Sequence, residues 1–202
     1  MRLRLFVSPI LVTIASTLVL SLSTADAVPL DFVTNLAGAN EVLPVVSPGT
    51  GQALVVLDPT ARTIQVNATF SGLTSNDMAA HIHCCAPLGT NVGVATTVPA
   101  FPGFPLGVTS GTYSSVVFDL TMATIYNPAF VTLQGGLPQA EAALIAGIEN
   151  GQTYFNIHTM NNPGGEIRGQ LEPVPEPATL LLLGTMMTGV GLVARWRRGR
   201  ST

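Results

Sequence analysis

Lysine is absent from this sequence of 202 residues, and charged residues of all kinds make up only 9% of it. Between residues 28 and 172 the only basic side chains other than histidine are Arg62 and Arg168. The same span holds nine acidic residues against these two, so its net charge is about −7. A domain without a cluster of lysine or arginine cannot neutralise phosphates, which excludes nucleic acid as a partner.

Low charge here does not come with the composition of a disordered chain or a coiled coil. Glycine (20 residues) and proline (15 residues) are frequent, which is typical of short strands joined by tight turns. About 145 residues remain when the two terminal segments described below are set aside, enough for one domain with its own core. The composition therefore predicts one mainly β domain over residues 28–172.

The first 27 residues have the pattern of a secretory signal peptide. Two arginines precede a long apolar run, and Ala25 and Ala27 then form a small-x-small cleavage motif. We expect signal peptidase to cut before Val28, which would make the protein an exported one. The alternative is an uncleaved membrane anchor.

Residues 173–202 have the pattern of a membrane tail. The apolar run 178–194 would span about 26 Å as a helix, just enough to cross a bilayer. The basic segment 195–200 that follows would stay on the cytoplasmic side and leave the domain outside. Its arginines are Arg195, Arg197, Arg198 and Arg200.

The residues before this run carry a more specific signal, Val174-Pro175-Glu176-Pro177. Followed by an apolar helix and an arginine cluster, they resemble the PEP-CTERM sorting signal of Gram-negative bacteria. The resemblance implies recognition by an exosortase, a membrane transpeptidase that removes the helix and passes the protein to the cell surface or extracellular matrix. Two prolines would keep the triplet extended and outside the helix. The alternative is a plain single-span anchor.

Within the domain, short apolar or alternating segments are separated by glycine and proline turns. Helical spacing of apolar residues between 127 and 150 predicts one short helical insertion, with a second helix as the alternative. Short strands, tight turns and one helical insertion together predict an antiparallel β-sandwich or Greek-key barrel. The expected strands are 31–37, 52–57, 62–70, 78–85, 113–121, 153–159 and 166–171, with an edge strand near 93–98.

All three histidines fall in two of these strands. His81 and His83 are two residues apart, so they share a face with Cys85, and His158 joins them if its strand pairs alongside. Three imidazoles and a thiol are a ligand set for copper or zinc. The competing interpretation is a structural network in which Asn156, Glu166 and Arg168 satisfy the histidines and fix the register of paired strands.

Four motifs together resemble the CHRD domain, named after chordin: Leu36–Pro44, Ala80–His83, Tyr154–Thr159 and Gly164–Leu171. Their order and spacing agree over nearly all of residues 29–172. The resemblance implies an extracellular β domain and no established reaction. The sequence departs from the commoner pattern at Cys84-Cys85, where a glycine often follows the second histidine. A vicinal disulfide, an intermolecular bridge, metal ligation and free thiols are all open for this pair.

An adjacent cysteine and histidine could act as a nucleophile and its base, but no other feature of the sequence marks an oxyanion site. These observations therefore favour a non-enzymatic protein. We expect a structural and binding module of the cell surface or matrix, with an unknown protein or polysaccharide as its partner. The alternative is an extracytoplasmic copper- or zinc-binding protein that uses His81, His83, His158 and Cys85.

Overall fold

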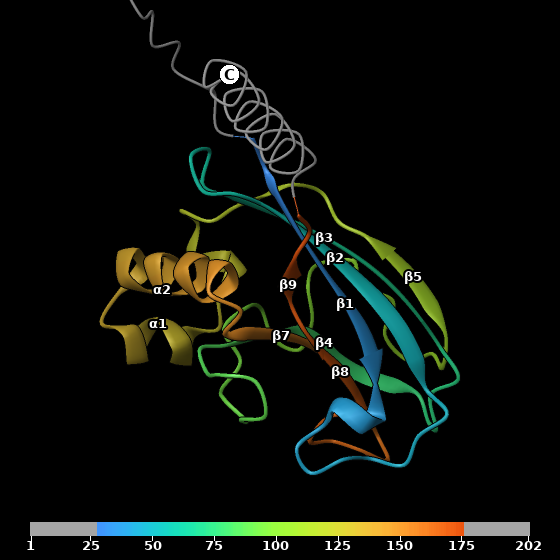
Figure 1. The fold of residues 1–202 in the computed structure, drawn as a ribbon. Helices are drawn as coiled ribbons and strands as arrows, with labels where there is room; N and C mark the ends of the chain where they lie inside the picture. The colour runs from blue at the N-terminus through green and yellow to red at the C-terminus, as the bar shows by residue number, and fades with distance from the viewer. Residues whose placement is uncertain (1–27, 176–202) are drawn as a thin grey trace, which may run out of the picture.

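The computed structural model describes residues 28–175, which form a sheet curled into a half-barrel with two helices beside it (Figure 1). The expected signal peptide and the expected membrane helix lie outside these residues. No helix within residues 28–175 has the length and apolar character needed to cross a bilayer.

Nine strands build one antiparallel sheet in the described part of the chain. Their order is β4-β7-β8-β1-β2-β3-β5, with β6 paired to β3 and β9 paired to β1. The N-terminal strand therefore lies between β2 and the C-terminal strands β8 and β9. The bounds are β1 (Leu30–Ala37), β2 (Thr50–Asp58), β3 (Thr63–Ser71), β4 (Asp77–Cys84), β5 (Gly111–Ser114), β6 (Phe118–Asp119), β7 (Thr153–Thr159), β8 (Ile167–Gln170) and β9 (Glu172–Pro173).

The single sheet corrects the predicted sandwich or Greek-key barrel. Short alternating strands are compatible with any of these architectures, because alternation fixes which face is buried and not how many sheets form. Here the concave side is covered by loop residues and helices instead of a second sheet. Phe101, from the loop that precedes β5, is buried and stacks on Phe155 of β7 with ring centroids 6.4 Å apart.

The helical insertion consists of two helices, α1 (Pro128–Gln134) and α2 (Leu137–Glu149), and not one. Asn127 caps α1 by accepting a hydrogen bond from the backbone N–H of Ala129. Gly135 ends α1 in the left-handed conformation at φ 89°, which a glycine adopts without steric cost. Helix α2 packs on β4 and β7 and buries Leu144 and Ile148 in the core.

The expected edge strand near residues 93–98 is reduced to isolated bridges, His83 with Val94 and Thr96 with Tyr126. The expected strand 113–121 is divided between β5 and β6. Both segments still carry backbone hydrogen bonds to the sheet, among them Ala95 N–H to the Ile82 carbonyl at 2.9 Å. The segment 92–100 is thereby fixed along the edge of β4 that does not pair with β7, where it forms one wall of the site described next.

Candidate functional site

The three histidines meet on the outer side of β4 and β7, the side away from the apolar core. His81 and His83 lie two residues apart on β4, and β7 runs antiparallel to it with Ala79 opposite His158 and His81 opposite Asn156. The intervening Ile82 points to the core and is fully buried. Strand alternation therefore gives the three imidazoles a common face.

The ring nitrogens come into close contact. His158 Nε2 lies 2.9 Å from His81 Nε2 and 3.4 Å from His83 Nε2. The three ligand atoms all lie within 4.8 Å of one another. The side chains are buried, with exposed fractions of 4% for His81, 7% for His83 and 8% for His158. The structure thus brings together the histidines that the sequence placed on one face.

Each of these imidazoles also contacts a backbone carbonyl through its Nδ1 atom. The carbonyls belong to Pro99 for His81 (3.0 Å), Val92 for His83 (2.7 Å) and Pro163 for His158 (3.0 Å). Two of these carbonyls come from the segment along the edge of β4, and the third from the loop between β7 and β8. The cluster is therefore held by loops as well as strands.

Burial keeps the cluster neutral. It lowers the pKa of His81 to about 3, and repulsion from the other two imidazoles acts in the same direction. Burial also lowers the pKa of His83 to about 4, although the hydrogen bond to the Val92 carbonyl opposes this. The pKa of His158 is likewise lowered by burial. At neutral pH all three imidazoles are uncharged.

Cys85, the fourth predicted ligand, does not belong to this cluster. Its sulfur is bonded to that of Cys84, so of the possibilities for the pair the structure has the vicinal disulfide. The Cys85 sulfur lies 3.3 Å from the Ala143 carbonyl of α2. A thiolate is needed both for metal ligation and for nucleophilic attack, and neither cysteine is free.

The predicted network of Asn156, Glu166 and Arg168 is divided into separate parts, and Glu166 does not contact the histidines. Its carboxylate is fully buried and accepts hydrogen bonds from Ser47 Oγ (2.6 Å), Thr159 Oγ1 (2.6 Å), Thr74 N and Oγ1 (2.7 Å each) and Asn162 Nδ2 (3.2 Å). Burial acts to raise the pKa of Glu166, but these hydrogen bonds outweigh it and the pKa is lowered.

Arg168 is the link between the histidines and the rest of the outer face. Its Nε donates to the Asn40 carbonyl at 2.7 Å and its Nη1 donates to Asn91 Oδ1 at 2.7 Å. The guanidinium lies 4.3 Å above the ring of Tyr154, and Tyr154 stacks on His83 with centroids 4.6 Å apart. Sequence reasoning missed Tyr154, although its position four residues before His158 places it on the same strand face.

Glu41 is a second buried acid that sequence reasoning did not single out. Its Oε2 lies 4.0 Å from Arg168 Nε, and its Oε1 has no hydrogen-bond partner. Burial raises the pKa of Glu41 to about 7, and the nearby Arg168 guanidinium lowers it only in part. The Oδ1 atom of Asn156 is also without a partner.

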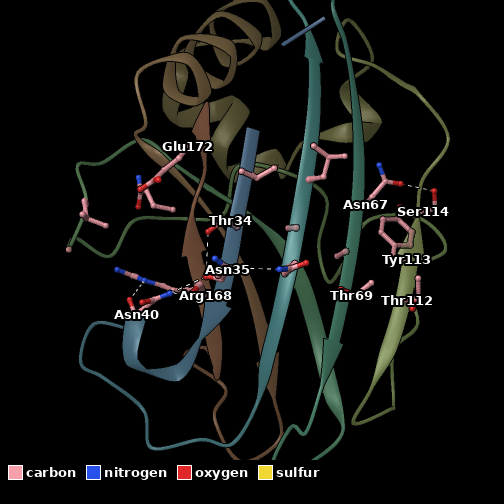
Figure 2. Close-up of a pocket in the computed structure, with 18 residues that line it drawn as sticks. Thr34, Asn35, Asn40, Asn67, Thr69, Thr112, Tyr113, Ser114, Arg168 and Glu172 are labelled. Atoms are coloured by element: carbon pink, nitrogen blue, oxygen red, sulfur yellow. Dashed lines mark hydrogen bonds between the residues drawn. The ribbon is translucent and has the colours of Figure 1, made fainter. Parts of the chain in front are cut away.

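A groove of about 910 Å³ runs over the outer face of β8, β1, β2, β3 and β5 (Figure 2). One row of exposed amides and hydroxyls crosses four strands, because its residues are direct partners in the strand pairing: Asn35, Gln52, Thr69 and Thr112. Arg168 and Asn40 lie at one end of the groove, and Thr112 and Ser114 at the other (Figure 2). Arg168 therefore belongs both to the groove wall and to the stack that ends at His83.

Of the predicted sorting residues, only Val174 and Pro175 lie in the described part of the chain. Both are exposed, and the Val174 N–H donates to the Asp31 carbonyl at 2.8 Å, next to the pairing of β9 with β1. The chain therefore leaves the domain at the end of the sheet where β1 begins. The remaining predicted residues are outside the described range: Glu176, Pro177, Arg195, Arg197 and Arg198 of the sorting signal, and Ala25 and Ala27 of the cleavage site.

Comparison with known proteins gives one match. A family model described as CHRD domain matches residues 32–171, which spans β1 to the residue after β8. No curated protein and no solved structure matches the chain.

Proposed function

The chain belongs to the CHRD domain family, and on that premise we propose that it is an exported, non-enzymatic module of the cell surface or extracellular matrix that binds an uncharged polysaccharide. A CHRD domain is a β-fold module of extracellular proteins and is of the binding type. The observation that carries the proposal is the groove on the outer face of the sheet.

The chemistry of the groove favours an uncharged, hydroxyl-rich ligand. Amide and hydroxyl side chains both donate and accept hydrogen bonds, as sugar hydroxyls do. The charged residues in the lining are Arg168 and Glu172, of opposite sign. The surrounding domain has an excess of acidic residues, which disfavours a polyanion. Tyr113, the aromatic residue in the lining, is buried with 5% of its surface exposed, so hydrogen bonds and not aromatic stacking would hold a ligand there.

Export and sorting rest on the two terminal motifs. We expect intact-mass analysis of surface material to show a chain that begins at Val28.

We expect the triple variant Pro175→Ala, Glu176→Ala, Pro177→Ala to keep its C-terminal tail and to stay in the cell envelope, because the sorting enzyme has lost its recognition element. Gln139→Ala, an exposed change on α2, serves as the control. Normal release of the triple variant would contradict the sorting proposal.

Polysaccharide binding is tested by affinity electrophoresis of the mature protein in gels that contain neutral dextran, a neutral β-glucan or acidic alginate. We expect retardation by a neutral polymer and none by alginate. The double variant Asn35→Ala, Gln52→Ala removes two groove amides and should weaken binding by about tenfold or more, since each hydrogen bond contributes about 1 kcal/mol. The control Gln139→Ala should behave as the wild type. Retardation by none of the polymers, or equal retardation of the double variant, would exclude the groove as a glycan site.

A further inference from the structure

We propose that His81, His83 and His158 bind one transition-metal ion of the zinc and copper class through their three Nε2 atoms. This inference does not depend on the polysaccharide proposal, because it rests on the histidine cluster beside the groove and not on the groove itself.

The carbonyl contacts fix the tautomer of each ring. A backbone carbonyl oxygen only accepts hydrogen bonds, so the Nδ1 atoms that face Pro99, Val92 and Pro163 must each carry a proton and donate it. A neutral imidazole has a single N–H group. Each Nε2 atom therefore has no proton and presents a lone pair.

The three lone pairs face one another across a short distance. The separations of 2.9 Å and 3.4 Å from His158 Nε2 to the other two Nε2 atoms are hydrogen-bond lengths, yet neither partner has a proton to donate. Such an arrangement is repulsive unless a cation lies between the nitrogens. A metal ion fits this place, because three imidazole nitrogens within 4.8 Å of one another form a ligand set for one ion.

The geometry and surroundings agree with those of metal sites. Nitrogen ligands of a tetrahedral zinc ion lie about 3.3 Å apart when the Zn–N bonds are about 2.0–2.1 Å. This value falls between the two separations that involve His158, and the third pair of nitrogens lies within 4.8 Å. Metal-ligating histidines characteristically donate their other N–H group to a carbonyl or carboxylate, as all three rings do here. Uncharged imidazoles suit zinc and copper and do not suit calcium or magnesium, which prefer oxygen ligands.

Three protein ligands leave the fourth tetrahedral position to water or another small ligand. Tyr154 stacks on the imidazole of His83 and holds it in place, and Arg168 covers Tyr154 on the side of the groove. Cys85 takes no part because its sulfur is in the disulfide.

The test uses the full-length chain, stripped with a chelator and then dialysed separately against zinc, copper(II), cobalt(II) and magnesium. We expect elemental analysis to find one zinc or copper ion per chain and no magnesium, and the cobalt form to show the intense visible bands of a tetrahedral site. His158→Gln should weaken zinc binding by more than the 10–100-fold that loss of a supporting contact typically causes. Asp119→Asn, an exposed acid away from the cluster, should leave binding unchanged.

Nitrogen NMR of the wild-type protein tests the same proposal without any substitution, because the chain has only three histidines. We expect three Nδ1–H tautomers in the apo protein and a shift of all three Nε2 resonances on addition of zinc. Absence of stoichiometric uptake, uptake that survives His158→Gln in a folded protein, or an apo spectrum with an Nε2–H tautomer or one imidazolium would overturn the metal site.

Discussion

Replacing Glu166 by alanine is expected to lower the free energy of unfolding by about 4 kcal/mol, because several buried donors are left without an acceptor at about 1–3 kcal/mol each. This is a large share of the roughly 5–15 kcal/mol typical of a domain. The carboxylate is fully buried and joins the loop that holds Ser47, the turn that holds Thr74 and the end of β7 at Thr159. Without it, these donors lose their acceptor in a water-poor environment. Urea denaturation measures the effect.

The matched control is Glu149→Ala on the exposed side of α2, which removes the same charge and should change stability by less than about 0.5 kcal/mol. Glu166→Gln keeps the shape but offers one acceptor oxygen in place of two, so it should also be destabilising. A loss in Glu166→Ala no larger than that in Glu149→Ala would show that the carboxylate does not hold the three segments together.

The contribution of Glu166 also has a defined pH dependence. Because its pKa in the folded protein is lowered from 4.5, the unfolded chain takes up the proton first as the pH falls. The stabilisation is therefore fully present above pH 4.5 and is lost below it. The difference in stability between the wild type and Glu166→Gln should shrink over that acidic range and stay constant between pH 6 and 8.

Replacing Gly147 by alanine is expected to destabilise the protein by about 2 kcal/mol, although alanine in a helix interior is normally more stable than glycine by about 1 kcal/mol. A Cβ atom at Gly147 of α2 would lie 2.5 Å from Cys84 Sγ and 2.9 Å from Cys85 Sγ. The bonded sulfurs cannot move apart to make room, so the helix must shift away from β4. Thermal and urea denaturation give the magnitude.

A double-mutant cycle isolates this cause. In the background Cys84→Ala, Cys85→Ala the sulfurs are gone, and Gly147→Ala should become neutral or stabilising by up to about 1 kcal/mol. Ala146→Gly, on the exposed side of the same helix, should cost about 1 kcal/mol in both backgrounds. The same destabilisation by Gly147→Ala with and without the sulfurs would contradict the contact with the disulfide.

Among the local elements, sequence reasoning was most successful where one face of a strand is buried. The alternation of β3 buries Ile64, Val66, Ala68 and Phe70 as expected. The strand 153–159 also has the bounds of β7, although β7 is buried on both faces. Sequence reasoning favoured one helix with two as the alternative, and the structure has two because the glycines at 135 and 136 separate α1 from α2. It failed at the number of sheets, because the loop around Phe101 fills space that a second sheet would occupy.

The sequence by itself determined the class of protein and the common face of the histidines. Alternation has a period of two, so His81 and His83 must point the same way on any strand that contains them. The charge deficit, the family motifs and the terminal patterns are likewise local and can be read without a fold.

Only the tertiary structure decided which groups face each other. The pairing of β4 with β7 brings His158 to His81 across 77 positions of sequence, and β8 then places Arg168 over Tyr154. The carbonyls of Val92, Pro99 and Pro163 fix the imidazole tautomers, and they come from loops that have no periodic signal. Such contacts depend on the path of the backbone and not on residue type, so no pattern in the chain could have revealed them.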